Sequence, residues 1–414
     1  MERIRCAPVI RRIVVHLAWT RRRAAVRTIC ITYMKIAFIH NSKKMGTGAH
    51  YINDLMATKL KENGVDVLNF YPKFRLTDAP NHLKGINNIL FFYSLLEKRK
   101  EVLKCDIIQG TTYTPLAFMQ FSKPIITHFG STTRGFLDAV PKTHELEPEC
   151  VRIYRRLKKN GVISELNLRT RRPLRDVATI EHYAASRSNL VIATSEIVRQ
   201  DLLKAGTPPE KVRVVHNAIE DYWFDEPRVA TENGPSIVYL GRIGEDPFTL
   251  KLKGVSRLIH LLRKFPCTQK LSIVMTKNKA LTAWMRDHIS NHTVAVNVKK
   301  SAIPALLQAH RGGIVLVTSR YEGFSLSLLE AMSQGLVPVS YAVGVAPEII
   351  VNGVNGFVVN SLEEAEEKIA LLLRDDGLRN YMAERAMRTA DLFRSEGLAA
   401  KLISIYSEVL ASTA

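Results

Sequence analysis

Residues 314–335 read IVLVTSRYEGFSLSLLEAMSQG and decide the fold of the chain around them. An apolar strand pattern covers residues 314–318, and a helical pattern runs over residues 325–334 until Gly335 ends it. Gly323 allows the sharp turn between the two patterns. A strand, a tight turn and a helix in this order predict one unit of a parallel sheet that is covered by helices.

The loop and the helix each carry one carboxylate, Glu322 and Glu330. The backbone amides of Phe324, Ser325 and Leu326 are expected to point out of the helix N-terminus, whose partial positive charge suits a phosphate. Carboxylates beside a phosphate accept hydrogen bonds from the hydroxyl groups of sugars and riboses. We therefore expect Glu322 to bind a hexose and Glu330 to bind a nucleotide ribose. Two solvated charges are the alternative, which is weaker for Glu330 because its neighbours are apolar.

Strand and helix patterns repeat along the chain in two sets, which a polar linker over residues 225–235 separates. Strands of the first set are expected at residues 35–40, 65–70, 106–109, 124–128, 190–194 and 212–215. Strands of the second set are expected at residues 236–240, 271–275, 294–298, 314–318, 337–341 and 356–359. Their alternation with helices implies two parallel sheets whose ligands bind at the carboxyl ends of the strands.

A glycine loop, Gly46-Thr-Gly48, follows the first expected strand. As a dinucleotide fingerprint this loop is weak, because it lacks a third glycine and an acidic residue at the end of the second strand. Farther along the chain, residues 87–104 have the spacing of an amphipathic helix. We expect that segment to pack on the first sheet.

Composition is that of a globular protein with more than one core. The chain has 414 residues, of which 46% are hydrophobic and 24% charged, and single cores stop growing at about 250–300 residues. No apolar stretch approaches the roughly 20 residues that span a bilayer, so no transmembrane helix is expected. Five cysteines without a C-x-x-C motif argue against a disulfide framework and a zinc site. A reducing cytoplasm is the expected compartment.

The net charge of +20 comes from the first half of the chain, where Lys and Arg outnumber Asp and Glu. The densest basic stretch is residues 152–159, followed by Arg169, Arg171, Arg172 and Arg175. Such a surface attracts anionic lipid or a polyphosphate acceptor. Nucleic acid is a rival partner, although no nucleic-acid-binding motif accompanies the charge. A solvated helix face explains the same residues equally well.

Residues 1–33 differ in composition from the rest of the chain, because they contain eight Arg and no Lys. Met34 starts a strand pattern directly, so one interpretation of this basic extension is a misassigned start. The other interpretation is a membrane-surface helix or targeting peptide, because Ile10, Ile13, Val14 and Leu17 recur at helical spacing.

Motifs on both sides of the Glu322 loop occur in the order and spacing of a known family. They are LVIATSE at 190–196, VVHN at 214–217, VYLGR at 238–242, KG at 253–254, GLVPVS at 335–340, PEII at 347–350 and NGVNGFVV at 352–359. Glu322 and Glu330 stand at the two positions of an E-x7-E signature. With this signature and these motifs, the chain resembles the family 4 retaining glycosyltransferases over residues 34–410.

This resemblance implies the GT-B fold, in which two facing, doubly wound, Rossmann-like α/β domains enclose a cleft. The acceptor-side domain is then expected at residues 34–225, and the nucleotide-sugar-binding domain at residues 226–395. Residues 396–414 are expected to form a helix that crosses back to the first domain.

The reaction that the resemblance implies breaks the bond between sugar C1 and phosphate, so a nucleotide diphosphate departs with negative charge. The sequence has no D-x-D motif for a divalent metal ion, and we expect no metal site. By resemblance, Arg242 and Lys253 neutralise the diphosphate, although a long connection over residues 243–252 offers Lys251 as a competitor for Lys253. Ordinary surface cations are the alternative.

His128 ends a strand of the first domain, where the family often places a histidine near the transferred sugar. We expect it to contact the sugar or the forming oxocarbenium ion, with a hydrogen-bonded loop residue as the alternative. His40 is a lesser candidate. The expected catalytic residues are His128, Glu322, Arg242 and Lys253. The expected donor-binding residues are Glu330, Gly323, Phe324, Ser325, Leu326, Gly46, Gly48 and Lys251.

The sequence therefore predicts a cytoplasmic, retaining, metal-independent enzyme that moves a hexosyl unit from a nucleotide-sugar, UDP favoured, to a hydroxyl acceptor. No cofactor is expected beyond this co-substrate. The acceptor is expected to be anionic or lipid-linked in cell-envelope synthesis, with contact at the inner face of the membrane and no nucleic acid. The alternatives are a non-hydrolysing nucleotide-sugar epimerase and a non-catalytic nucleotide- or membrane-binding relative.

Overall fold

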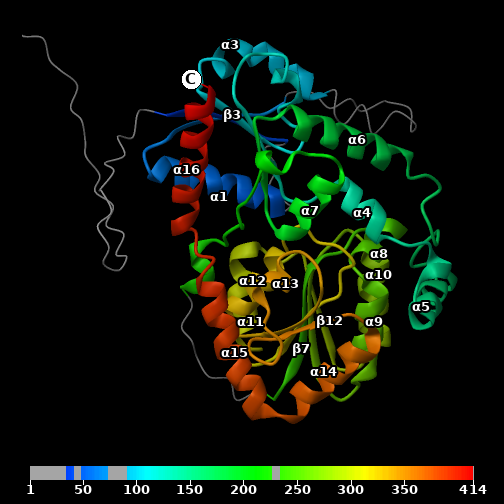
Figure 1. Ribbon diagram of the computed structural model, residues 1–414. Helices are drawn as coiled ribbons and strands as arrows, with labels where there is room; N and C mark the ends of the chain where they lie inside the picture. The colour runs from blue at the N-terminus through cyan, green and yellow to red at the C-terminus, as the bar shows by residue number, and fades with distance from the viewer. Residues whose placement is uncertain (1–33, 42–47, 73–90, 226–233, 414) are drawn as a thin grey trace, which may run out of the picture.

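A computed structural model describes residues 34–41, 48–72, 91–225 and 234–413. Two six-stranded sheets, all of whose strand pairs are parallel, form two lobes (Figure 1). The first-lobe strands are β1 (Lys35–Ile39), β2 (Asp66–Phe70), β3 (Ile107–Thr111), β4 (Ile125–Phe129), β5 (Leu190–Ala193) and β6 (Val212–Val214). The second-lobe strands are β7 (Ser236–Arg242), β8 (Gln269–Met275), β9 (His292–Val296), β10 (Ile314–Val317), β11 (Val337–Tyr341) and β12 (Phe357–Val359).

The strand orders are β2-β1-β3-β4-β5-β6 and β12-β11-β10-β7-β8-β9. Central strands such as β4 and β10 are buried along their whole length, which is why β10 is a continuous apolar run rather than an alternating one. Parallel strands need crossover connections, and the helices provide them. The prediction of two doubly wound α/β lobes is confirmed.

Helices surround both sheets. Those of the first half of the chain are α1 (Gly48–Glu62), α3 (Arg99–Val102), α4 (Thr133–Ala139), α5 (Pro148–Lys159), α6 (Arg172–Arg187) and α7 (Glu196–Lys204), with 3-10 turns η2 (Phe91–Lys98), η3 (Leu116–Phe118), η4 (Thr143–Glu145), η5 (Pro209–Lys211) and η6 (Asp221–Phe224). Those of the second half are α8 (Pro247–Leu252), α9 (Val255–Lys264), α10 (Lys279–His288), α11 (Ile303–Gln308), α12 (Leu326–Ser333), α13 (Ala346–Ile349), α14 (Leu362–Arg374), α15 (Asp376–Asp391) and α16 (Glu396–Thr413), with the 3-10 turn η7 (Lys300–Ala302).

The last helix, α16, returns to the first lobe as expected and lies beside α1 (Figure 1). Its apolar side chains Leu398, Leu402 and Tyr406 join the core formed by α1 and β1. The Tyr406 hydroxyl donates a hydrogen bond of 2.7 Å to Gln109 Oε1 on β3, where both side chains are buried. This contact anchors the end of the chain to the first sheet.

Helix α5 lies on the flank of the second lobe against α9, although it comes from the first half of the chain (Figure 1). Its buried residues Cys150, Ile153, Tyr154 and Leu157 belong to the core of the second sheet. Glu147, just before the helix, accepts hydrogen bonds from arginines of the second lobe, Arg257 at 2.7 Å and Arg320 at 2.7 Å. The basic residues 152–159 therefore belong spatially to the second lobe, whereas the sequence analysis placed them on the acceptor side.

The amphipathic segment expected at residues 87–104 is described from Phe91, and there it forms η2 followed by α3 instead of one α-helix. Phe92 and Leu95 pack into the core of the first lobe, which confirms that the segment lies on the first sheet. Within the described residues, no helix has the length and apolar character needed to cross a bilayer. Residues 1–33 lie outside the described ranges.

Candidate active site

The two lobes meet where the loop after β10 faces the loop after β4. A Cβ atom on Gly323 would lie 1.7 Å from the carbonyl oxygen of Gly130, so any side chain there would collide with the first lobe. Ser195 of the first lobe donates a hydrogen bond of 2.6 Å to the Gly323 carbonyl oxygen. Position 323 therefore requires a glycine, because the backbones of the two lobes approach each other closely there. This contact brings the strand end that carries His128 to the Glu322 loop.

Glu322 and Lys253 form an ion pair in which Nζ lies 2.6 Å from Oε1. Ser319 donates a second hydrogen bond of 2.6 Å to the same oxygen. Gly254 has a left-handed φ of +60°, and its missing side chain lets the Lys253 turn sit on the end of β10, where Thr318 Oγ1 donates to the Lys253 carbonyl at 3.1 Å. The expected Lys-Gly pair thus has a local reason, because the glycine lets Lys253 reach Glu322.

Lys251 points elsewhere. Its ammonium donates to Asn167 Oδ1 at 2.6 Å and to the Pro141 carbonyl at 3.3 Å, both in the first half of the chain. Burial, with a smaller contribution from the charge of Arg171, lowers the pKa of Lys251 to about 8. Of the two competing lysines, Lys253 is the one beside the Glu322 loop.

Arg242 is the last residue of β7, which lies between β10 and β8 in the second sheet. Its side chain is exposed and has no ion-pair partner within the part of the chain that the structure describes. An exposed guanidinium at the carboxyl edge of the sheet is available to an anionic ligand.

The turn before α12 is held in an unusual conformation. Ser325 has a left-handed φ of 76°, and its buried Oγ has no hydrogen-bond partner among the described residues. A non-glycine residue in this region costs about 1 kcal/mol or more, and such strain collects at binding sites. Phe324 packs on His216 and Phe393, and its carbonyl accepts a hydrogen bond of 2.9 Å from the Val345 amide. The amides at the start of α12 are therefore held in place by packing behind them.

Leu326, the first residue of α12, lies between the lobes. It packs against the cores of both. A Cβ atom on Gly48, at the start of α1, would lie 3.1 Å from Leu326 Cδ1. The start of α1 therefore faces the start of α12 across the lobe junction. Gly46, the other glycine of that loop, lies outside the described residues.

Glu330 is 6% exposed inside α12 and pairs with a lysine that the sequence analysis did not name. Lys300 Nζ lies 3.1 Å from Glu330 Oε1 and 2.6 Å from Glu220 Oε1. The same ammonium lies 4.2 Å from the ring centroid of Tyr51 on α1. Burial raises the pKa of the Glu330 carboxyl, and the Lys300 ammonium opposes that rise. A buried carboxylate predicts a cationic partner, but nothing local to Lys300 identifies it as that partner.

His128 is 4% exposed and is the penultimate residue of β4, which ends at Phe129, one residue later than expected. Burial lowers the pKa of its imidazole to about 4, against a smaller opposing interaction with Asn217, so the ring is neutral near pH 7. Its Nδ1 is buried without a hydrogen-bond partner among the described residues. The lesser candidate His40 is also buried and bonds Asn69 at 2.8 Å.

Two further residues of the second lobe that the sequence analysis did not propose for the site hold the lobes together. The Tyr321 hydroxyl donates to Asp201 at 2.7 Å and lies 3.1 Å from Thr132 Oγ1, where both partners belong to the first lobe. Glu348 accepts a hydrogen bond of 2.8 Å from the Glu196 amide and lies 2.8 Å from His216 Nε2. These contacts set the spacing of the two lobes at the site.

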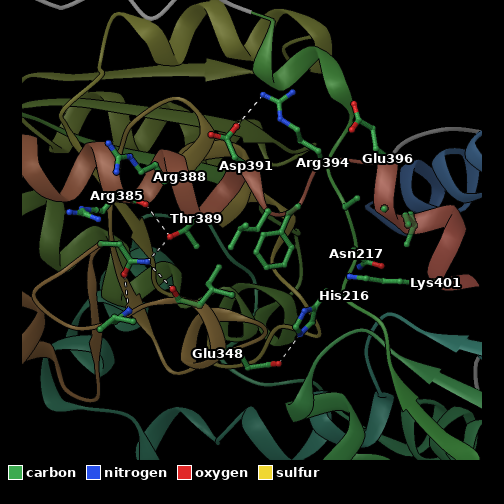
Figure 2. A pocket seen from close by; sticks show the side chains of 18 of the residues that line it. His216, Asn217, Glu348, Arg385, Arg388, Thr389, Asp391, Arg394, Glu396 and Lys401 are labelled. Atoms are coloured by element: carbon green, nitrogen blue, oxygen red, sulfur yellow. Dashed lines mark hydrogen bonds and ion pairs between the residues drawn. The ribbon is translucent and has the colours of Figure 1, made fainter. Parts of the chain in front are cut away.

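A separate cavity of about 840 Å³ lies behind the Glu322 loop, where the chain passes between the lobes (Figure 2). Figure 2 shows Arg385 and Arg388 on one side of the cavity and Asn217 with Lys401 on the other. The His216 and Glu348 pair lies at its edge (Figure 2). None of the residues expected to bind the donor lines it. Among the described residues no group of three or more potential metal ligands was found.

Comparison with known proteins agrees with the fold. The family model described as Glycosyltransferase Family 4 matches residues 48–222, and the one described as Glycosyl transferases group 1 matches residues 225–389. A glycosyltransferase is the class that the two matching family models define. The chain belongs to the family 4 glycosyltransferases, as its motifs predicted.

Individual relatives are distant. An uncharacterized glycosyltransferase of Methanocaldococcus jannaschii is 23% identical over 254 residues, which are 56% of this chain and 63% of the relative, so the chain spans less than two thirds of that protein. Sucrose-phosphate synthase from Thermosynechococcus elongatus has a TM-score of 0.68 at 15% identity, covering 92% of this chain and 100% of its own. HepE of Anabaena, solved in complex with UDP and glucose, has a TM-score of 0.62 at 18% identity, covering 91% and 100%. At these identities the two structures share the fold.

Proposed function

We propose that this glycosyltransferase moves a hexosyl unit from UDP-sugar to a hydroxyl acceptor, with retention of anomeric configuration and without a metal ion. The observation that carries the proposal is the Lys253–Glu322 pair at the start of α12, directly beneath the loop that follows His128. A cation, a carboxylate and free helix amides then lie beside one another, as a sugar attached to a diphosphate requires.

Each part of the donor has a proposed partner. Glu322 accepts hydrogen bonds from the hexose hydroxyls, while Lys253 and Arg242 contact the diphosphate. The amides of Phe324, Ser325 and Leu326 add the helix dipole at the phosphates. Glu330 accepts the ribose hydroxyls. Gly48, at the start of α1, approaches the phosphates from the first lobe.

Retention is proposed to proceed on one face of the sugar. The C1–O bond to phosphate breaks, and its electron pair leaves with the nucleoside diphosphate. The acceptor oxygen bonds C1 on the same face, and its proton passes to the departing phosphate oxygen. Arg242, Lys253 and the helix amides stabilise the charge that develops on the leaving group, so protein cations do what a metal ion does elsewhere. The neutral ring of His128 contacts the sugar as positive charge develops at C1.

UDP is favoured as the donor nucleotide because HepE, with the same fold, was solved with UDP and glucose. The exposed basic residues of α5 on the second lobe would hold the enzyme at the inner face of the membrane, and an anionic or lipid-linked acceptor of the cell envelope is proposed because it would be reached there. These residues are Arg152, Arg155, Arg156, Lys158 and Lys159. Reversing the charge of Arg155, Lys158 and Lys159 should reduce cosedimentation with anionic vesicles at low salt. Equal cosedimentation of this variant and the parent protein would remove the membrane part of the proposal.

A thermal-shift panel of UDP, GDP and ADP tests the donor, because a ligand that binds the native state raises the unfolding temperature. UDP should give the largest shift, and Glu330→Ala should reduce it. Glu322→Ala should keep the UDP shift and chiefly impair turnover of the sugar. Normal kinetics in both variants would refute the site. UDP-sugar incubated without an acceptor should stay unchanged, whereas release of an epimerised nucleotide-sugar would identify an epimerase.

A further inference from the structure

We propose that Lys300 is a positioning residue of the donor site, which aims the Glu330 carboxylate at the ribose and ties the nucleotide end of the site to the first lobe. This inference rests on the proposed function, because it assumes that Glu330 binds the nucleotide. It assigns a role to a residue that contacts the donor only through its partner.

The first step is the position of the ammonium between two carboxylates. Lys300 Nζ lies 2.6 Å from Glu220 Oε1 and 3.1 Å from Glu330 Oε1. The exposed fractions of the three side chains are 15% for Lys300, 18% for Glu220 and 8% for Glu330. Little water reaches this cluster, so the pairing determines where the Glu330 oxygens point.

The second step is the charge of the cluster. Two carboxylates face one ammonium, and among the described residues Tyr222 and Tyr51 are titratable groups beside them. Burial lowers the pKa of Lys300, but Glu330 and Glu220 raise it by more, so the ammonium stays charged. Without that charge, the two acids would repel each other in a poorly solvated place, and one would take up a proton. A protonated Glu330 would lose half of its capacity to accept hydrogen bonds from a ribose diol.

The third step is the contact with the first lobe. The Lys300 ammonium lies over the ring of Tyr51, which belongs to the first turn of α1. Glu220 precedes η6, where the chain passes from the first lobe to the second. Lys300 therefore touches both lobes and the connection between them. This arrangement requires the lobes to be as close as they are here, so the ribose end of the site is complete only when they are together.

Lys300→Met tests the proposal, because methionine keeps most of the side-chain length and removes the charge. At pH 7 we expect the Kd for UDP to rise by about tenfold, with a much smaller change in kcat at saturating donor. Lys300→Arg should restore most of the affinity. Lys299→Met is the control. It removes the same charge one residue away, from a side chain that is exposed. An equal loss in both variants would reduce the effect to general electrostatics and overturn the proposal.

The pH dependence separates positioning from a structural role. Affinity should fall as pH falls through the pKa of Glu330, and removal of Lys300 should move that fall to higher pH. The Kd of Lys300→Met for UDP, divided by that of the parent protein, should therefore shrink as pH rises from about 6 to 9. The titration of UDP itself cancels in this ratio. A ratio that stays constant with pH, or equal affinity at all pH values, would overturn the proposal. In a Glu330→Gln background, Lys300→Met should have little further effect.

Failure of this inference is distinguishable from failure of the proposed function. If Glu330→Gln binds UDP as tightly as the parent protein, the proposed donor site is wrong. If Glu330→Gln loses UDP binding while Lys300→Met keeps it, only the role of Lys300 is wrong. The unfolding temperature of each variant is measured together with its UDP affinity, to show that the variant is folded. Should Lys300→Met fail to fold, Tyr51→Leu, which keeps every charge, is expected to weaken UDP binding by about threefold. Unchanged binding in that variant would then reject the link to the first lobe.

Discussion

Two lysine–glutamate pairs of the candidate site, Lys253–Glu322 and Lys300–Glu330, have the same chemistry in different surroundings. Lys253 and Glu322 are 2.6 Å apart with 22% and 18% of their side chains exposed, whereas Lys300 and Glu330 are 3.1 Å apart with 15% and 8% exposed. Water and ligand reach the first pair more easily, so a donor can exchange partners with it. The second pair is shielded and held by both lobes. This difference fits the proposed roles, in which the first pair acts on the transferred group and the second supports the nucleotide.

The largest expected effect breaks the more exposed pair. Lys253→Met should lower kcat by about 100-fold to 1000-fold, because a preorganised charge at the leaving group is lost. Steady-state kinetics with the donor that the thermal-shift panel identifies measure the effect. Lys251→Met is the matched control, since its amine bonds Asn167 and should affect unfolding more than turnover. A larger loss of kcat from Lys251→Met would reverse the assignment of the two lysines.

A pair of facing glycines tests how the lobes bring the more exposed pair to His128. Gly323→Ala should destabilise the protein by about 3–4 kcal/mol, because its Cβ would meet the Gly130 carbonyl oxygen at 1.7 Å. Gly130→Ala should be nearly neutral, because a Cβ there meets nothing within 4 Å. Denaturant titration measures both free energies of unfolding. Equal costs at the two positions would show that the lobe contact is looser than described.

His128 gives the first-lobe side of the site a pH dependence of folding. Burial lowers the pKa of its imidazole from 6.5 to about 4, so between these values the unfolded chain binds a proton that the native chain does not. The native state therefore loses stability as pH falls through this window, by at most about 3 kcal/mol. Denaturant titrations from pH 7 to pH 4 should show a shallower loss for His128→Gln than for the parent protein. Parallel pH profiles would place the histidine in a more solvated site.

The smallest expected effect concerns folding and compares the pairs directly. Lys253→Met should reduce the free energy of unfolding by less than about 1 kcal/mol, because partly exposed ion pairs contribute little. Lys300→Met should cost more, because it leaves the buried Glu330 carboxylate without its cation and facing Glu220. Thermal unfolding at pH 7 ranks the two variants. The reverse order would show that exposure does not distinguish the pairs, and the division of their roles would lose its physical basis.

Local features of the site could be predicted from the sequence, because they depend on neighbouring residues. The strand before Gly323, the helix after it and the positions of Glu322 and Glu330 all follow from apolar periodicity and turn chemistry. The pairing of Lys253 with Gly254 also has a local cause, a left-handed turn against the end of β10. The family follows from the same motifs, which both family models match.

Contacts between distant parts of the chain could not be predicted in the same way. Composition indicates that α5 is basic, but only packing places it on the second lobe. The choice between Lys251 and Lys253 depends on where Asn167 lies, and Lys300 is defined only by Glu220, Glu330 and Tyr51 around it.

By itself, the sequence determined two lobes of alternating strands and helices, the strand–turn–helix unit that carries Glu322 and Glu330, and the family. Backbone propensity and periodicity are local, so one stretch of chain is enough to specify them. The tertiary structure decided which lysine meets which carboxylate, why Gly323 admits no side chain and which charges are shielded from water. Those properties depend on how closely the two lobes approach each other, and no single segment of the sequence specifies that distance.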